Sequence, residues 1–251
     1  MSETYYTLDC GNTNCTLAKY QGSQPTLINP LDNNFDSNSL GESPIYSSSV
    51  TKIPEILKSK KSNFISLNKY KTKNQFLSMP ISYSETLGED RLFAAFSIFE
   101  SFVSYNQLMN YIIIDAGTYL TVDLVNSSGL EGGHISPGIN TQLKSFSTGH
   151  QLPLVTSCDF ETYLNKGIFP CWPSNTMTAI LETVRKQNLS FIETITKQVI
   201  KSEIILTGGD ASLLALLLST STTKLTVKTL PYLVHSGLNQ ARSFLVQSKE
   251  N

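Results

Sequence analysis

An Asp-x-Gly turn occurs twice in this chain, and its residue types suit the binding of a metal-bound chain of phosphates. Asp9-Cys10-Gly11-Asn12-Thr13 follows one apolar run, and Asp115-Ala116-Gly117-Thr118 follows another about a hundred residues later. Each turn offers one carboxylate, several backbone N–H groups and a hydroxyl, and its glycine lets the backbone approach a ligand closely. Mg²⁺ binds one or two protein carboxylates and keeps several waters, so a single Asp beside phosphates would serve it. One copy is common as a plain turn, but two copies favour binding.

A third carboxylate lies in Gly88-Glu89-Asp90-Arg91. Asp90 is expected in the first turn of a helix over about 87–105, where the helix dipole favours an ionised carboxylate. That is the state in which a general base accepts a proton from an alcohol. Arg91 offers a planar guanidinium to a carboxylate or phosphate. The alternative is a solvated acidic helix start, with Arg91 in a surface ion pair worth under about 1 kcal/mol.

Asp115 follows three consecutive isoleucines, so we expect it at a buried strand end. A buried carboxylate there would need a cation partner, or would cap a turn. Gly132-Gly133 and Gly208-Gly209 are expected at strand-to-helix junctions, either for close approach to a flat or anionic ligand or only as turn residues. Neither pair matches a P-loop or Gly-x-Gly-x-x-Gly, so those nucleotide folds are not supported.

The cysteines and histidines show no ligand-like spacing. The four cysteines stand at positions 10, 15, 158 and 171 without a Cys-x-x-Cys, so we expect neither a zinc site nor a disulfide framework, and a reducing cytoplasm as the location. We treat the histidines as ordinary residues: His134, His150 and His235.

The elements that must position these residues are strands mixed with helices in two similar halves. The first half contains a strand pair over 4–20, short strands near 45–46 and 64–67, and the helix over 87–105, with capping-box spacing at Thr86–Glu89. The second half contains strands over 111–116, 119–125, 129–135, 204–206 and 225–229, and helices over 138–147, 174–187, 190–201, 210–219 and 235–247. This pattern predicts an α/β architecture built by duplication, with halves 1–108 and 109–251.

Composition excludes several classes of protein. The 251 residues, 40% hydrophobic and 16% charged, suit a globular protein with a real core. A formal net charge of −1 gives no general attraction for nucleic acid or an anionic membrane. The first residues show no basic region followed by a long apolar core, so we expect no signal peptide, and no apolar run approaches the ~20 residues of a spanning helix. We therefore expect neither nucleic acid nor a membrane as partner.

Taken in order, these motifs resemble those of the type III pantothenate kinases, in the superfamily of acetate kinase, sugar kinases, Hsp70 and actin. The resemblance covers nearly the whole chain through Asp9–Thr13, Gly88–Arg91, Asp115–Thr118, Gly132–Gly138 with Leu152-Pro153, Asn175–Ile180, Thr207–Gly209 and Leu233–Leu238. It implies two RNase-H-like halves of the actin-like ATPase type around an interdomain cleft.

The resemblance also implies an activity, the ATP-dependent phosphorylation of pantothenate to 4'-phosphopantothenate, which is the first step of coenzyme A biosynthesis. Asp90 would be the general base, Asp9 would place Mg²⁺ through water, and Asp115 would bind K⁺ or NH₄⁺. The residues implied to line ATP are Asp9, Cys10, Gly11, Asn12, Thr13, Asn14, Cys15, Thr16 and Thr118. Those implied for pantothenate are Gly88, Glu89, Asp90 and Arg91, with Thr176 from the neighbouring subunit of a homodimer.

Three positions depart from the family pattern. Ile81 occupies the place of a tyrosine, with Tyr83 the nearest, while Ser84 replaces a proline and Thr183 a glycine. Two alternatives therefore stay open: a weak or inactive relative that binds nucleotide or pantothenate as a regulator, and a kinase for another small alcohol. The presence of Asp90 argues against the first, because a pure binder does not need a general base.

Overall fold

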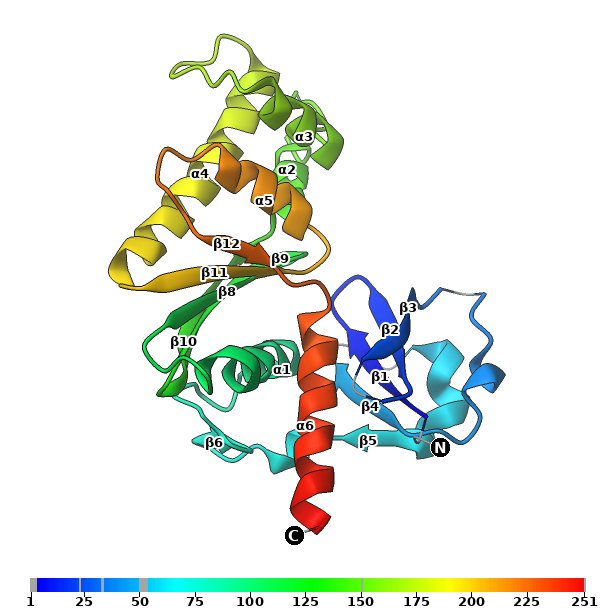
Figure 1. The fold of residues 1–251 in the computed structure, drawn as a ribbon. Helices are drawn as coiled ribbons and strands as arrows, with labels where there is room; N and C mark the ends of the chain where they lie inside the picture. The colour runs from blue at the N-terminus through cyan, green and yellow to red at the C-terminus, as the bar shows by residue number, and fades with distance from the viewer. Residues whose placement is uncertain (1–3, 23, 33, 50–53, 150, 251) are drawn as a thin grey trace. The chain divides into compact units, whose positions relative to one another are not determined.

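The computed structural model describes residues 4–22, 24–32, 34–49, 54–149 and 151–250, and the chain forms two compact units (Figure 1). Unit 1 comprises residues 1–107, 127–132 and 232–251, and unit 2 comprises residues 108–126 and 133–231. The predicted halves, 1–108 and 109–251, differ from these units because residues 127–132 and the closing helix belong to unit 1.

Unit 1 is built on a five-stranded sheet in the order β3-β2-β1-β4-β5. Its strands are β1 (Tyr5–Cys10), β2 (Cys15–Tyr20), β3 (Pro25–Pro30), β4 (Ile45–Ser49) and β5 (Phe64–Ser66). Because strand residues alternate between faces, Tyr6, Leu8 and Cys10 share one face. They pack there in a core with Leu40 of η1 (Ser37–Leu40) and Leu57 of η2 (Glu55–Asn63). Smaller elements follow: η3 (Asn68–Tyr70), β6 (Gln75–Phe76) and β7 (Met79–Pro80).

The opposite face of this sheet contacts α6 (Leu233–Glu250), which lies beside α1 (Glu89–Ile98) (Figure 1). The two helices approach so closely that a Cβ on Gly237 would stand 1.9 Å from the Phe93 carbonyl oxygen. A residue without a side chain is therefore needed at this crossing. Beyond Ile98 the chain continues in a π-helical turn, Phe99–Val103.

The expected capping box at the start of α1 is absent. Gly88 is the N-cap and makes no side-chain capping bond. The Thr86 hydroxyl instead lies 2.6 Å from the Ser84 hydroxyl, because the helix begins too late for Thr86 to reach its first amides. The predicted helix is present, but its capping-box start is wrong.

Unit 2 repeats the strand arrangement of unit 1. Its sheet has the order β10-β9-β8-β11-β12, formed by β8 (Asn110–Ala116), β9 (Tyr119–Asn126), β10 (Gly129–Pro137), β11 (Ser202–Thr207) and β12 (Val227–Thr229). β8 pairs antiparallel with β9 and parallel with β11, as β1 does with β2 and β4. The predicted duplication of an α/β unit is confirmed.

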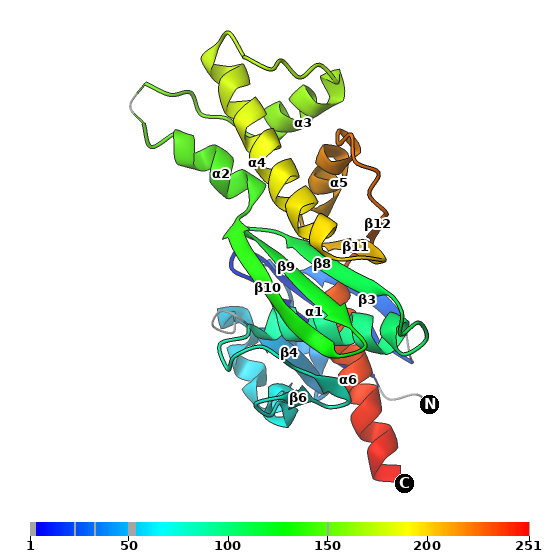
Figure 2. The ribbon, with the colours of Figure 1, turned by 90° about the vertical axis from the view of Figure 1, so that its left-hand side faces the viewer.

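Four helices lie on one side of the unit 2 sheet (Figure 2): α2 (Ile139–Phe146), α3 (Ser157–Lys166), α4 (Thr176–Gln198) and α5 (Ala211–Ser219). The prediction of separate helices over 174–187 and 190–201 is wrong, because α4 is continuous. Asn188, near the expected break, donates to the Val184 carbonyl at 2.8 Å and is satisfied inside the helix. Helix α3 escaped prediction, although Thr156 and Asp159 form a capping box at its start. None of the described helices combines the length and apolarity needed to cross a membrane.

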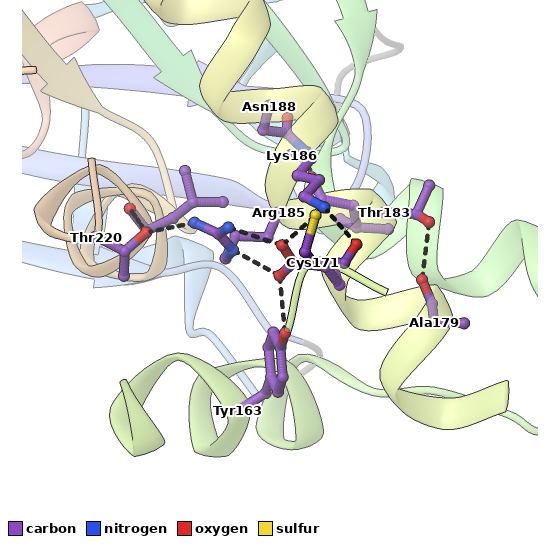
Figure 3. A network of polar contacts seen from close by, with 11 residues as sticks. Tyr163, Cys171, Ala179, Thr183, Arg185, Lys186, Asn188 and Thr220 are labelled. Atoms are coloured by element: carbon purple, nitrogen blue, oxygen red, sulfur yellow. Dashed lines mark hydrogen bonds and ion pairs between the residues drawn. The ribbon is translucent and has the colours of Figure 1, made fainter. Parts of the chain in front are cut away.

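A buried ionic network ties α3 and α4 together (Figure 3). Glu182 is 2% exposed and accepts hydrogen bonds from the Tyr163 hydroxyl at 2.7 Å and from Arg185 at 2.7 and 2.8 Å. Burial acts to raise the pKa of Glu182, but the bonds from Arg185 and Tyr163 outweigh it and leave that pKa lowered. The Arg185 guanidinium also lies 4.1 Å from the Phe169 ring centroid. The network thereby anchors the segment that leads into Thr176.

Candidate active site

The first Asp-x-Gly turn is the loop of the β1–β2 hairpin. Asp9 and Thr16 are cross-strand partners at its base, and the Gly11 amide donates to the Asn14 carbonyl at 3.0 Å. The three residues at the tip, 12–14, are exposed. The predicted phosphate-binding segment is therefore a short loop with outward polar groups and a carboxylate at its base.

A disulfide between Cys10 and Cys15 closes this hairpin, so the expectation of no disulfide is wrong for this pair. The two cysteines flank a four-residue loop symmetrically, and the strand register makes them partners with Cα atoms 4.2 Å apart. That distance is typical of directly opposed residues in an antiparallel pair. The spacing of the two cysteines, on either side of the loop of a predicted hairpin, could therefore have predicted this disulfide. Cys158 and Cys171 are exposed and not disulfide-bonded.

Thr16, expected to line the phosphates, contacts a histidine of α6. His235 is 1% exposed, with Nδ1 2.7 Å from the Thr7 hydroxyl oxygen and Nε2 2.8 Å from that of Thr16. Burial lowers the pKa of His235 to about 4, so its ring is neutral at pH 7. No sequence signal indicated this contact, because Thr16 and His235 are 219 positions apart.

Asp90 lies in the first turn of α1, as predicted, and its Oδ1 accepts a hydrogen bond from the Arg91 amide at 2.8 Å. Arg91 is buried, with 6% exposure, so the surface-pair alternative is wrong for it. Its Nη1 donates to the Tyr83 hydroxyl at 3.0 Å, and its guanidinium lies 4.7 Å from the centroid of that ring. Ile81 is buried in the core. Tyr83 is thus the tyrosine that contacts the Gly-Glu-Asp-Arg segment.

In unit 2 the second turn meets two other glycine-containing segments. Thr207 is the parallel partner of Asp115, and Gly208 follows with a φ of +91°. A Cβ on Gly208 would stand 2.2 Å from the Asp115 Oδ1 atom. The Gly138 amide donates to the Thr118 carbonyl at 3.0 Å. Three separately predicted motifs therefore converge at one edge of this sheet.

This convergence fits a cation. The Asp115 carboxylate and the Ala116 carbonyl oxygen both lie against Gly208, and hard cations prefer oxygen ligands of these kinds. The Asp210 amide fixes the Ala116 carbonyl through a 2.8 Å hydrogen bond. Within the described residues, no cluster of three or more His, Cys, Asp or Glu side chains could hold a metal ion. A divalent ion would thus depend on few protein ligands, as Mg²⁺ with phosphates does.

The remaining predicted residues lie apart from these contacts. Gly132-Gly133 lie inside β10, so their expected place at a strand-to-helix junction is wrong. Thr176 is the first residue of α4 and is exposed, after Asn175, which caps the helix. Thr183 donates to the Ala179 carbonyl of its own helix at 2.8 Å (Figure 3).

A second histidine, His134, makes an aromatic contact elsewhere in unit 2. The His134 ring packs edge-on against Phe191, with centroids 5.8 Å apart. His150 lies outside the described residues.

The duplicated units, each with its Asp-x-Gly hairpin, define the actin-like ATPase fold that sugar kinases share. A ROK hexokinase from Thermus thermophilus aligns over 99% of this chain and 100% of its own, with a TM-score of 0.51 and 11% identity. A Baf family transcriptional activator from Campylobacter jejuni aligns over 98% and 100%, with a TM-score of 0.61 and 20% identity. At these identities the likeness concerns the fold alone.

The sequence profile of the type III pantothenate kinases matches residues 6–198, and the chain belongs to this family. A type III pantothenate kinase from Cytophaga hutchinsonii is 31% identical over 145 residues, which are 56% of this chain and 58% of that protein. The chain spans about half the length of the curated relatives it matches. The resemblance stated from the motifs is confirmed.

Proposed function

We propose that this protein transfers the γ-phosphoryl group of ATP to the primary hydroxyl of pantothenate, giving 4'-phosphopantothenate and ADP. The observation that carries the proposal is Asp90 in the first turn of a buried helix, next to an arginine fixed by Tyr83. Membership of the type III pantothenate kinase family supports it.

Asp90 is assigned the general base. The hydroxyl oxygen of pantothenate forms a bond to the γ-phosphorus, the bond from that phosphorus to its bridging oxygen breaks, and the hydroxyl proton passes to Asp90. The first turn of α1 favours the ionised carboxylate that this step requires. Most of the catalysis in such a transfer is positioning and charge neutralisation, so the fixed backbone of the turns matters as much as the base.

The two hairpin turns are assigned to ATP and its ions. The segment Asp9–Thr16 and Thr118 would contact the phosphates, Asp9 would orient Mg²⁺ through water, and Asp115 would bind K⁺ or NH₄⁺. When bound, these cations neutralise negative charge on the transferring phosphate. The oxygen atoms around Gly208 support the monovalent site.

Pantothenate is assigned to the segment Gly88–Arg91, with Tyr83 beside it. Thr176 of a second subunit would complete this site in a homodimer. We place the enzyme in the cytoplasm, where ATP and pantothenate are both available and where the Cys10–Cys15 disulfide would be subject to reduction.

The test is pantothenate-dependent ADP release with Mg²⁺, with and without K⁺. Asp90→Asn should lower turnover by about 10²–10⁴-fold, because general-base catalysis contributes that much. Glu161→Gln, in an exposed acid of α3, is the matched control and should keep the wild-type rate. Circular dichroism would verify that both variants fold.

The alternatives predict other outcomes. Binding of ATP and pantothenate without turnover would favour the regulator, and turnover on a different small alcohol would favour the other kinase. A near-normal rate in Asp90→Asn would remove Asp90 from the mechanism.

A further inference from the structure

His235 links helix α6 to the base of the candidate phosphate hairpin. Both of its ring nitrogens contact threonine hydroxyls, that of Thr7 on β1 and that of Thr16 on β2, at 2.7 and 2.8 Å. Helix α6 thus holds two neighbouring strands through a single buried ring.

The position of Thr16 gives this contact a role beyond packing. Thr16 is the cross-strand partner of Asp9, and directly opposed residues project from the same face of a sheet. Thr7 and Asp9 are two apart on β1 and share that face as well. Asp9 and Thr16 are both partly exposed, whereas Thr7 and His235 are fully buried. These four side chains therefore form a row, which runs from the buried His235 ring outward to the Asp9 carboxylate that we propose orients Mg²⁺.

The backbone of His235 is held to the sheet as well as its ring. The Tyr20 hydroxyl donates to the His235 carbonyl at 3.3 Å. Burial raises the pKa of Tyr20 to about 12, so this hydroxyl keeps its hydrogen at pH 7. A neutral ring carries one hydrogen, so one of its nitrogens donates to a threonine hydroxyl and the other accepts from one.

From this geometry we infer that His235 is a positioning residue for nucleotide binding, which fixes the Thr16 side chain beside Asp9. The inference rests on the proposed function in that it takes the Asp9 hairpin as the ATP site.

Two amide substitutions separate the contact made by Nε2 from the contact made by Nδ1. In His235→Gln the amide lies near the former Nε2 and can still meet Thr16, whereas in His235→Asn it lies near the former Nδ1 and can meet only Thr7. Loss of one buried hydrogen bond costs about 0.5–1.5 kcal/mol. We therefore expect the Kd for Mg²⁺–ATP to rise roughly three- to tenfold in His235→Asn and less than about twofold in His235→Gln.

Asn239→Ala is the matched control. Asn239 is on the same helix and accepts a hydrogen bond from the Tyr5 hydroxyl, away from Thr16. This variant should lower the melting temperature without changing the Kd for Mg²⁺–ATP. Equal changes in Kd for all three variants, or none in His235→Asn, would overturn the inference and leave His235 a purely structural residue.

Calorimetric titration with Mg²⁺–ATP in the absence of pantothenate separates this inference from the proposed activity. A selective loss of affinity in His235→Asn would support it even if the wild type did not phosphorylate pantothenate. A wild type that fails to bind Mg²⁺–ATP would overturn it.

Nitrogen NMR of the wild type gives a second measurement that does not depend on any variant folding. We expect a neutral His235 ring at pH 7 in a single tautomer, as two fixed threonine contacts require. A charged ring at pH 7, or one that averages over both tautomers, would show that the two threonines do not hold it and would overturn the inference.

Discussion

The carboxylate of Asp115 lies against a residue that can have no side chain. Gly208 has a φ of +91°, and a Cβ there would stand 2.2 Å from Asp115 Oδ1, so both its backbone and its surroundings require glycine. Its neighbour Gly209 has open space at the same place. The Thr-Gly-Gly motif thus contains one glycine that shapes the proposed cation site and one that does not.

We predict that Gly208→Ala lowers the free energy of unfolding by roughly 3 kcal/mol, from left-handed strain and overlap with Asp115. It should also weaken activation by K⁺. Gly209→Ala should stay within about 0.5 kcal/mol of the wild type. Urea unfolding and the ADP-release assay over a K⁺ series measure both effects. Equal stability and K⁺ response in the two variants would contradict the assignment.

The buried ring of His235 also predicts a pH dependence of stability. Its pKa is about 4 in the folded protein and near 6.5 in the unfolded chain. Below pH 6.5 only the unfolded chain gains the proton, so stability is full above that pH and is lost as the pH falls toward 4. Between about pH 8 and about pH 4.5, the wild type should lose about 2–3 kcal/mol more than His235→Gln. Urea unfolding at both pH values measures this difference. An equal loss of stability in the two proteins would contradict the prediction.

At the scale of elements, the β1–β2 hairpin is held from two sides. The Cys10–Cys15 disulfide closes its loop on one face, and His235 contacts its other face. Because the apolar face of β1 packs against η1 and η2, the loop leaves the sheet from a fixed base. A loop with the proposed role of holding phosphates would gain from this constraint, since less order has to be created on binding.

We predict that reduction of the Cys10–Cys15 disulfide lowers the free energy of unfolding by about 2 kcal/mol, the loop-closure value for so short a ring. Urea unfolding with and without dithiothreitol measures it. In a Cys158→Ser, Cys171→Ser double variant the same difference should persist, because those cysteines are exposed and outside the disulfide. No effect of reductant on either protein would show that the disulfide does not stabilise the fold.

At the scale of the whole molecule, the site as we propose it would be completed by a second copy of the chain. Thr176 is the first residue of a helix that the buried Glu182–Arg185 pair anchors. Its exposed side chain is therefore held in a fixed position from which it could contact a partner subunit. Asp90 would act in one subunit while Thr176 comes from the other.

Mixed dimers test this sharing. Asp90→Asn and Thr176→Val should each be nearly inactive alone, while an equimolar refolded mixture should recover roughly a quarter of wild-type activity, because half of the dimers carry one intact site. Sedimentation of the wild type provides the control for dimer formation. A mixture as inactive as its components would contradict a shared site.

Local patterns in the sequence determined the two Asp-x-Gly hairpins, the helix that begins beside Asp90, the duplicated α/β architecture and the family. They did so because alternation, glycine turns and helix starts depend on neighbouring residues. The single helix α4 shows where local patterns were insufficient, because burial of Asn188 and packing on the sheet decided that segment. Helix α3 was missed although its capping box is a local signal.

Only the tertiary structure brought His235 to Thr16, Tyr83 to Arg91 and Gly208 to Asp115. Two of these contacts join residues about a hundred or more positions apart, and the third crosses an irregular segment before a helix. Each depends on which strands pair and how helices dock, and no periodicity along the chain encodes that.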